Sequence, residues 1–408
     1  MIARARRPAP SRAARAAAAA LLAAVVPATS LGDDAAPPSS VPAFTNEVEA
    51  SLVRAIVGLR ESGLRHALGE IDLALAKTPN FKLGHLIRGD LLMARSGKPV
   101  AFGPVASTNA GVGLLQDEAR ARLRHYFDAP PRDHLPLPMM QLAPSQSHAL
   151  LVDTDRSRLY VFANRGGEPS YVTDFYISLG KNGVEKRREG DQKTPLGVYT
   201  IVSSKEKLPD FYGPGAFPIS YPNEWDKLHK RNGYGIWLHG TPSETYSRPP
   251  RATDGCVVLT NDDLRRLARY VDVGRTPVVI SGDIEWAPPG RWQESRGEFM
   301  AAFEQWRADW ESRDTARYLS HYSPRFRADG KDLAAWGAQK RKVNARKAWV
   351  KVGVSDLSVF GHPDGDGMFV VTFAQDYRSS NLSNRTVKRQ YWSRDQGRWR
   401  IVFETVIS

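Results

Sequence analysis

A histidine and the chain's single cysteine lie in two short apolar runs, and no other feature of the 408-residue sequence restricts the fold as strongly. The first run, residues 235–240, contains His239 next to Gly240, and the second, residues 253–259, contains Cys256 behind Gly255. A loop rich in Ser, Thr, Pro and Arg separates the runs. Two short β-strands joined by such a loop would bring an imidazole and a thiol together at the edge of a sheet.

This pair of side chains suits nucleophilic catalysis. A thiolate is the nucleophilic form of cysteine, and a neighbouring imidazole lowers the thiol pKa and carries its proton. Gly255 lets the backbone turn so that N–H groups face a developing oxyanion, which is worth about 3 kcal/mol per donor. The alternative is a buried and inert Cys256, because free cysteine also behaves as a small hydrophobic residue.

Residues 1–32 have the three-part pattern of a secretory signal peptide. Five arginines precede an apolar run over residues 16–26, and small residues follow before Asp33. That run is too short to span a bilayer, which needs about 20 apolar residues. Cleavage is expected after Ser30 or Gly32. A mitochondrial transit peptide remains the alternative, because the segment is rich in arginine and has no acidic residue.

The number of cysteines indicates the cellular compartment of the protein, and its net charge indicates the kind of molecule that it binds. Exported chains usually pair their cysteines in disulfides, but Cys256 has no internal partner, which favours the catalytic role over the inert one. The formal net charge is +13, or +8 without the five N-terminal arginines. Cell-wall peptides with carboxylates, anionic lipids and nucleic acids would all suit this charge, so charge alone does not identify the partner.

Breaks in composition divide the rest of the chain into three domains. Residues 46–128 have helical periodicity that resembles a tetratricopeptide unit over barely one repeat, and a small helical domain that packs or dimerises is the alternative. A Pro-rich segment, residues 130–144, is predicted to be a stiff linker. Residues 148–283 alternate apolar and polar side chains, which predicts a mainly β domain with one or two helices, one of them capped by Asn261.

The last domain, residues 295–408, follows the Pro-Gly break at residues 287–290. Its aromatic residues Phe299, Phe303, Trp306 and Trp310 fall on one face of a helix. Three alternating strands are predicted later in the domain, over residues 369–377, 385–392 and 399–406. Helices followed by a meander indicate an α+β domain, which we expect to be separately folded and non-catalytic. The basic run at residues 340–351 is interpreted as a solvated helix face, with an acidic polymer as the alternative ligand.

The motif of His239-Gly240 with Gly255-Cys256-Val257 resembles the active-site signature of the L,D-transpeptidase catalytic domain, also called the YkuD domain. Three further segments match that family in order: residues 177–180, residues 193–199, and residues 217–218 with 221–223. The Thr253-Asp254 pair before Gly-Cys is similar to the YafK-like subgroup. The C-terminal domain resembles the NTF2-like fold, as in bacterial cell-shape L,D-carboxypeptidases.

The resemblance implies a multidomain protein with a small α-helical N-terminal domain, a mainly β catalytic domain and an α+β NTF2-like domain. It implies a periplasmic enzyme of cell-wall biogenesis, an L,D-transpeptidase that acts on peptidoglycan stem peptides at the bond between diaminopimelate and D-alanine. An L,D-carboxypeptidase or endopeptidase remains the alternative, as does a catalytically silent cell-wall scaffold. We expect no cofactor, no metal, no nucleic acid and no integral membrane segment after signal removal, and a homodimer is left open.

The expected site follows from the same motifs. Cys256 is the expected nucleophile and His239 the base, while Gly255 and Asp254 are expected to support the oxyanion. Asp254 could instead orient His239 or lie as an ordinary surface residue. The residues expected to contact substrate are Tyr221, Trp237, Gly240 and Thr253.

Two features of this region leave questions about the substrate. Val258 stands where many family members have an arginine, so the residue that holds the substrate carboxylate is not evident. Residues 211–229 are predicted to be a lid over the site, with an ordinary surface loop as the alternative.

Overall fold

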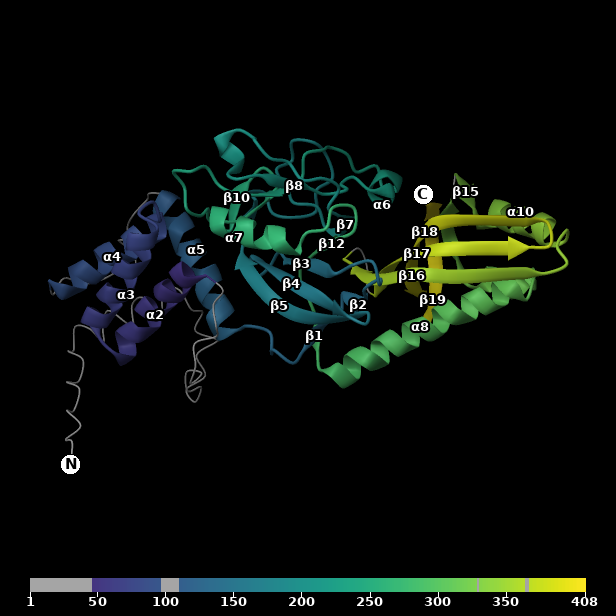
Figure 1. The fold of residues 1–408 in the computed structure, drawn as a ribbon, viewed down its shortest axis with the longest axis horizontal. Helices are drawn as coiled ribbons and strands as arrows, with labels where there is room; N and C mark the ends of the chain where they lie inside the picture. Colours follow the sequence, from purple (N-terminus) through teal and green to yellow (C-terminus); the bar gives the residue numbers. More distant parts are fainter. Residues whose placement is uncertain (1–45, 97–109, 329, 364–366) are drawn as a thin grey trace, which may run out of the picture.

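A computed structural model describes residues 46–96, 110–328, 330–363 and 367–408, so the predicted signal peptide lies outside the described residues. Three parts follow one another along the long axis of the molecule (Figure 1): a group of helices, a central part built on small sheets, and a C-terminal sheet flanked by a long helix. The predicted fold class is therefore confirmed.

The N-terminal part is helical, as its periodicity predicts. Its described helices are α2 (Glu47–Glu61), α3 (Leu64–Lys77), α4 (Lys82–Arg95) and α5 (Ala110–Phe127). The apolar stripe of α2 is buried, with Leu52 and Leu59 fully covered. Asn46 caps this helix, because its side chain accepts hydrogen bonds from the backbone N–H groups of Val48 and Glu49.

The central part contains a five-stranded sheet in the order β5-β4-β3-β12-β7 and a three-stranded sheet in the order β11-β9-β8. An apolar core lies between them, and the antiparallel pair β3 and β4 is the predicted hairpin. The strands of the larger sheet are β3 (His148–Asp153), β4 (Arg158–Arg165), β5 (Glu168–Tyr176), β7 (Gly197–Thr200) and β12 (Pro277–Ser281). Those of the smaller sheet are β8 (Ala216–Pro218), β9 (Trp237–His239) and β11 (Val257–Val258).

Short helices and a further strand pair complete the central part. They are β6 (Leu179–Gly180), β10 (Arg251–Thr253), η2 (Asp210–Tyr212), α6 (Glu224–Leu228), α7 (Asn261–Leu267) and η3 (Ala268–Tyr270). The N-cap of α7 is Thr260 and not Asn261, because the Thr260 hydroxyl accepts from the backbone N–H of Asp263. The side chain of Asn261 instead accepts from the backbone N–H of Thr241 at 2.8 Å.

The C-terminal part is a seven-stranded sheet in the order β15-β14-β19-β18-β17-β16-β2, with helices against it. The aromatic face of the long helix packs on this sheet as predicted; the rings of Phe303 and Phe373 lie 5.3 Å apart. Its helices are α8 (Pro289–Glu311), α9 (Thr315–Ser320) and α10 (Leu333–Asn344). The strands that follow α8 are β14 (Tyr322–Ala328), β15 (Lys331–Asp332), β16 (Val350–His362), β17 (Met368–Ser379), β18 (Leu382–Asp395) and β19 (Arg398–Val406).

The Pro-rich segment predicted to be a stiff linker contributes one short strand to each of two sheets. Strand β1 (Leu135–Pro136) pairs with β13 (Trp286–Ala287), and β2 (Met139–Gln141) forms the edge of the C-terminal sheet beside β16. The expectation of a stiff spacer is therefore wrong for residues 135–141. Backbone hydrogen bonds tie this segment to strands that lie more than a hundred residues later in the chain.

The C-terminal part is not packed as an independent unit either. One apolar core combines residues of the central sheet, of β2 and of the C-terminal sheet, including Phe162, Val279 and Phe403. Trp225 of α6 joins this core and stacks on Tyr391 of β18 with ring centroids 4.5 Å apart. Removing the C-terminal part would uncover this shared core, and separate folding of that part stays a prediction.

The central part also contacts the N-terminal helices, and this contact is made of charged side chains. Arg122 of α5 pairs with Glu49 of α2 at 3.1 Å, and Arg158 of β4 pairs with the same carboxylate at 2.8 Å. Arg158 also pairs with Asp174 of β5; Glu49, Arg122 and Arg158 are buried, and Asp174 is largely buried. Because each buried charge has an opposite partner, the network meets the condition under which such burial is tolerated.

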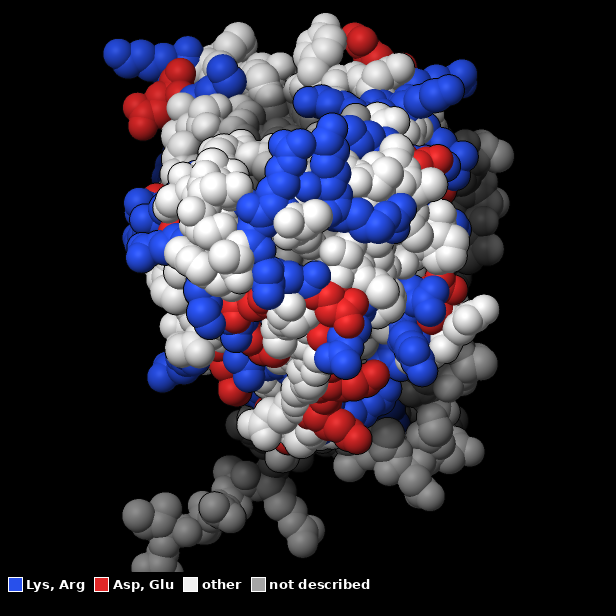
Figure 2. Space-filling view, turned by 90° about the vertical axis from the view of Figure 1, so that its right-hand side faces the viewer, with Lys and Arg blue, Asp and Glu red and all other residues white. Residues whose placement is uncertain are grey.

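The far end of the C-terminal part is basic. Figure 2 shows Lys and Arg gathered over the upper half of this end of the molecule. Arg341, Lys342 and Arg346, in and after α10, are exposed, whereas Lys347 is buried and donates to Ser379 at 2.8 Å. The predicted solvated face thus holds for part of the basic run. Among the described residues, no helix is both long enough and apolar enough to cross a membrane.

Candidate active site

Two adjacent parallel strands of the smaller sheet bring the chain segments of His239 and Cys256 next to each other. His239 of β9 lies opposite Val258 of β11, and Cys256 stands two residues before Val258. Side chains of paired residues, and of residues two apart, point to the same face. Strand spacing and rise put the two Cα atoms roughly 8 Å apart. Extending the alternation of β11 back by one residue to Cys256 gives the two side chains the same face, and their direct contact stays a prediction.

A backbone carbonyl sets the orientation of the imidazole. The Nδ1 atom of His239 lies 2.7 Å from the carbonyl oxygen of Gly240. A carbonyl only accepts hydrogen bonds, so this geometry assigns the ring proton to Nδ1 and leaves the lone pair on Nε2. Burial lowers the pKa of His239 to about 4, although the Gly240 carbonyl acts in the opposite direction. The ring is therefore a neutral base at pH 7 with its accepting nitrogen available.

The thiol of Cys256 is partly exposed and has its own backbone contact. Its Sγ donates to the carbonyl oxygen of Gly235 at 3.3 Å. Burial raises the thiol pKa, while the backbone N–H of Trp237 and the charge of Arg248 oppose this rise. A raised thiol pKa beside a lowered imidazole pKa means that the resting pair is neutral. The thiol must consequently lose its proton to a base during the reaction.

Hydrogen bonds around Gly255 fix the turn that leads into the nucleophile. Gly255 has φ +125°, and a Cβ atom there would lie 2.6 Å from the carbonyl oxygen of Lys193, so only glycine fits. Thr253 donates to the carbonyl of Cys256 at 2.7 Å and accepts from the N–H of Gly255 at 3.1 Å. Thr253 is thus buried, and its hydroxyl holds this turn through internal hydrogen bonds. The Gly255 N–H, which was expected in the oxyanion hole, already donates its hydrogen bond to Thr253.

Asp254 has an exposed side chain that pairs with a lysine. Its carboxylate pairs with Lys181 at 2.9 Å, and 73% of its side chain is exposed. Because the Gly240 carbonyl occupies Nδ1 of His239, Asp254 is not the group that orients the ring. The surface interpretation of Asp254 is therefore the one that the contacts favour.

The three other residues expected to contact substrate differ in their surroundings. Tyr221 is buried in the core, where its hydroxyl donates to the carbonyl of Asn232 at 2.9 Å, so it is a packing residue. Gly240 supports His239, and a Cβ atom there would meet Asn261 Oδ1 at 2.2 Å. Trp237 is half-buried, with its ring 5.0 Å from that of Tyr212. Of these three, only Trp237 remains a candidate to touch substrate.

The segment predicted to be a lid has two separate roles. In η2, the ring of Tyr212 lies 5.1 Å from that of His239, and the ring of Phe211 lies 6.0 Å from it. This half covers the imidazole as a lid would. The other half, α6, is packed into the shared core through Trp225. Only the part near Phe211 and Tyr212 lies against His239, and its role as a lid stays a prediction.

One residue that sequence reasoning missed is Arg248. Its guanidinium carbon lies 4.9 Å from the centre of the Phe211 ring, next to His239. Its charge lowers the pKa of both Cys256 and His239. The only signal in the sequence was the presence of arginine in the loop between the two motifs.

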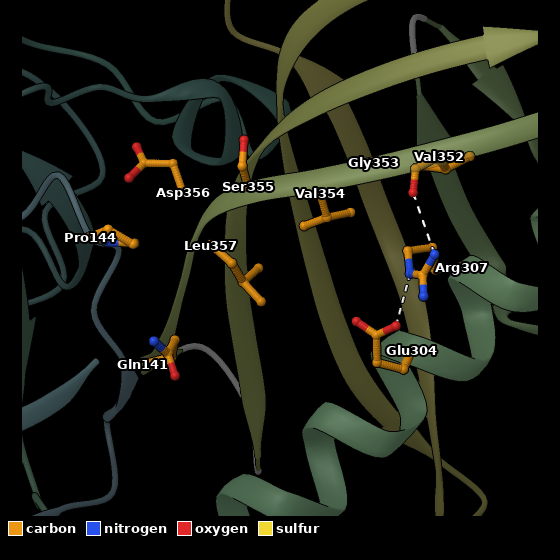
Figure 3. A pocket seen from close by; sticks show the side chains of 10 residues that line it. All are labelled: Gln141, Pro144, Glu304, Arg307, Val352, Gly353, Val354, Ser355, Asp356 and Leu357. Carbon is orange, nitrogen blue, oxygen red and sulfur yellow. Dashed lines mark hydrogen bonds and ion pairs between the residues drawn. The ribbon is translucent and has the colours of Figure 1, made fainter. Parts of the chain in front are cut away.

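A hollow elsewhere in the molecule contains none of the predicted site residues. Figure 3 shows it between residues from β2, α8 and β16, with Gln141, Glu304 and Leu357 among the side chains that line it. Its volume is about 480 Å³, and an ion pair of 2.8 Å between Arg307 and Glu304 lies on one wall. Among the described ranges, no group of three or more His, Cys, Asp and Glu side chains is arranged to hold a metal ion.

Comparisons with sequence families agree with the motifs. Residues 147–280 match the family described as the L,D-transpeptidase catalytic domain, YkuD, and residues 298–405 match the Cds6 C-terminal NTF2-like domain. A curated relative, the putative L,D-transpeptidase YafK of Escherichia coli K12, is 25% identical over 114 residues. That match covers 28% of this chain and 42% of the relative, so the chain spans less than half of YafK.

Two solved structures resemble more of the chain. Bd1075 of Bdellovibrio bacteriovorus is 28% identical with a TM-score of 0.60, and the match covers 67% of this chain and 98% of that chain. The helical cell shape determining protein Pgp2 of Campylobacter jejuni is 27% identical with a TM-score of 0.57, over 66% of this chain and 94% of that chain. The chain thus combines an L,D-transpeptidase catalytic domain with an NTF2-like domain, and about a third of it has no counterpart in these structures.

Proposed function

We propose that this protein is a cysteine-dependent acyltransferase that acts on peptidoglycan stem peptides at the bond between diaminopimelate and D-alanine. The observation that carries the proposal is that His239 ends β9 and Cys256 directly precedes the neighbouring strand β11, with the His239 ring held by the Gly240 carbonyl. The match of residues 147–280 to the L,D-transpeptidase catalytic domain supports this reaction class, and the proposed substrate follows from the resemblance to that family.

In the first step, Nε2 of His239 takes the proton of the Cys256 thiol and the thiolate attacks the carbonyl carbon of diaminopimelate. The Cys256 N–H is the proposed donor to the oxyanion, because the Gly255 N–H is held by Thr253. The bond to D-alanine breaks, and its nitrogen leaves with the proton that His239 returns. The product of this step is a thioester between Cys256 and the stem peptide.

In the second step, an acceptor attacks the thioester and His239 removes the acceptor's proton while the Cys256 thiol is restored. An amine acceptor makes a cross-link, as in a transpeptidase. Water makes a shortened stem peptide, as in an L,D-carboxypeptidase or endopeptidase. The hydrolytic alternative is supported by the likeness to a cell shape determining protein, which covers both the catalytic and the NTF2-like domain. YafK, the relative described as a transpeptidase, matches a smaller part of the chain.

The proposed location is the periplasm, where peptidoglycan lies. The signal-peptide pattern of residues 1–32 and the relationship to L,D-transpeptidases support export. The basic surface at the C-terminal end would attract the carboxylates of the cell wall. A role in cell shape is proposed on the likeness to Pgp2.

The test is to incubate the purified protein with a free stem tetrapeptide, with and without an added D-amino acid as the acceptor amine. Mass spectrometry of the products then separates the three outcomes. A tripeptide alone indicates hydrolysis, and a peptide that carries the added amino acid indicates transfer. Unchanged substrate under all conditions, with a correctly folded protein, would refute the proposed function. Cys256→Ala is the control for contaminating activity.

A further inference from the structure

The loop that leads from His239 toward Cys256 is held by the N-terminal helices. The ring of Tyr246 is buried in the helical core, 4.8 Å from the ring of Phe81. The hydroxyl of Ser247 donates to Glu118 of α5 at 2.6 Å, and the amide of Asn80 donates to the carbonyl of Ser243 at 3.1 Å. The loop thus has contacts from α5 and from the turn between α3 and α4, although it belongs to the catalytic domain.

These contacts fix the next residue, Arg248, from both sides. Its carbonyl oxygen accepts a hydrogen bond from the hydroxyl of Tyr176 in β5 at 3.0 Å. Its guanidinium lies over the Phe211 ring, on the half of the lid that covers His239. The side chain therefore lies against the ring that neighbours His239, on a backbone anchored at Ser247 and at its own carbonyl.

The charge of Arg248 has no fixed counter-ion. The side chain is half-buried, yet no carboxylate in residues 46–96, 110–328, 330–363 or 367–408 forms an ion pair with it. Asp254, which lies near enough to influence its pKa, is paired with Lys181 instead. A partly desolvated cation without a partner is costly unless an anion arrives to neutralise it. Arginine binds a carboxylate through two parallel hydrogen bonds.

We propose that Arg248 binds the free carboxylate of the residue that leaves, and so takes the role of the arginine that is missing at Val258. This proposal rests on the proposed function, in which that carboxylate belongs to the D-alanine next to the bond that is cut. Arg248 recognises substrate, and Ser247 and Tyr246 are positioning residues. The N-terminal helices then have a function in specificity, because they hold the loop that presents Arg248.

The first experiment needs no peptidoglycan. Cys256 is the only cysteine, so its alkylation is measured with anionic iodoacetate and with neutral iodoacetamide. In each case the thiolate sulfur forms a bond to carbon and iodide leaves. Loss of a charge-assisted contact is worth about tenfold or more, so we expect Arg248→Gln to lower the iodoacetate-to-iodoacetamide rate ratio by about that factor. Any change in thiolate content affects both reagents and cancels in the ratio.

Matched variants separate recognition from general damage. Arg251→Gln removes an exposed arginine three residues later and should keep the wild-type ratio. Arg248→Lys keeps the charge and should retain part of the preference for iodoacetate. Ser247→Ala should lower the ratio by a smaller factor, about threefold, because Arg248 is then less well held. An unchanged ratio in folded Arg248→Gln would overturn the proposal.

The second experiment compares a stem tetrapeptide that ends in a free carboxylate with one that ends in a carboxamide. We expect Arg248→Gln to raise KM about 10- to 100-fold for the acid and to leave the amide unchanged. An equal loss on both peptides would assign Arg248 a structural role only and would overturn the proposal. If the wild type cuts neither peptide, the proposed function fails, and the alkylation ratio still decides whether Arg248 forms an anion site.

Discussion

The catalytic domain is held on one side by charges and on the other by aromatic rings. Toward the helices, the contact is built on the buried network of Arg122, Glu49, Arg158 and Asp174. Toward the NTF2-like domain, Trp225 stacks on Tyr391 within a shared apolar core. Apolar burial is strong but tolerates small shifts, whereas ion pairs and their hydrogen bonds hold only in one geometry.

The difference fits the position of the active-site loop. Ser247, which precedes Arg248, donates to Glu118, and Glu118 pairs with Arg122 of the charged network at 2.9 Å. The directional contact is thus continuous with the loop that reaches the catalytic pair. The aromatic contact instead fixes α6, the part of the predicted lid that does not cover His239. Substitutions in the charged contact should therefore change both stability and substrate specificity. Substitutions in the aromatic contact should change stability alone.

The largest effect is expected when one charge of the network is removed. Arg158→Met leaves Glu49 and Asp174 buried with less compensation, and breaking a buried pair in this way costs about 4 kcal/mol. Chemical denaturation measures the change in the free energy of unfolding. Arg265→Met is the matched control, because its pair with Asp262 is exposed and should be worth less than about 1 kcal/mol. Equal losses in the two variants would show that the buried network is not a special contact.

Removing the aromatic contact should cost about 3 kcal/mol. Trp225→Ala leaves a cavity against Tyr391 and Phe403 in the shared core. We expect this variant to unfold at a lower denaturant concentration but to keep the wild-type iodoacetate-to-iodoacetamide ratio. Arg158→Met should lower both quantities. A changed ratio in Trp225→Ala would mean that the aromatic contact also positions the active-site loop.

A smaller effect is expected from acid. Burial lowers the pKa of His125, at the charged contact, to about 4, below its ordinary value of 6.5. Between pH 6.5 and pH 4, His125 is protonated in the unfolded chain but not in the folded chain. The free energy of unfolding therefore falls as the pH drops through this range. His125→Gln should remove about 2 kcal/mol of this fall. Unfolding free energies measured between pH 7 and pH 4.5 test it, and an identical slope in the variant would contradict the assignment.

The residues that carry the catalytic motif could be predicted because they form a local pattern. The apolar runs around His239 and Cys256 became β9 and β11 with their neighbours, and the aromatic stripe of α8 was buried as predicted. The strands β1 and β2 were missed. They are only two and three residues long, and pairing with distant partners forms them without any periodicity of their own.

The charged contact between the helices and the central sheet could not be predicted from the sequence either. Glu49 and Arg122 each look like surface charges on a helix, and only the fold brings them to Arg158. Tyr221 and Thr253 were assigned to substrate because they lie in matched motifs, but their hydroxyls are used in internal hydrogen bonds. Arg248 lies in a loop without a periodic pattern, so its place beside the catalytic pair depends on contacts with the helices.

The central claim is that Cys256 forms the bond to the stem peptide and His239 activates it. Intact-protein mass spectrometry after rapid mixing with the tetrapeptide tests this directly. We predict a mass increase equal to the stem peptide without its D-alanine, located on Cys256. It should be absent in Cys256→Ala, which should stay folded because Cys256 is partly exposed. In His239→Ala it should form at least about 10²-fold more slowly. Turnover by folded Cys256→Ala, or an adduct on another residue, would contradict the account.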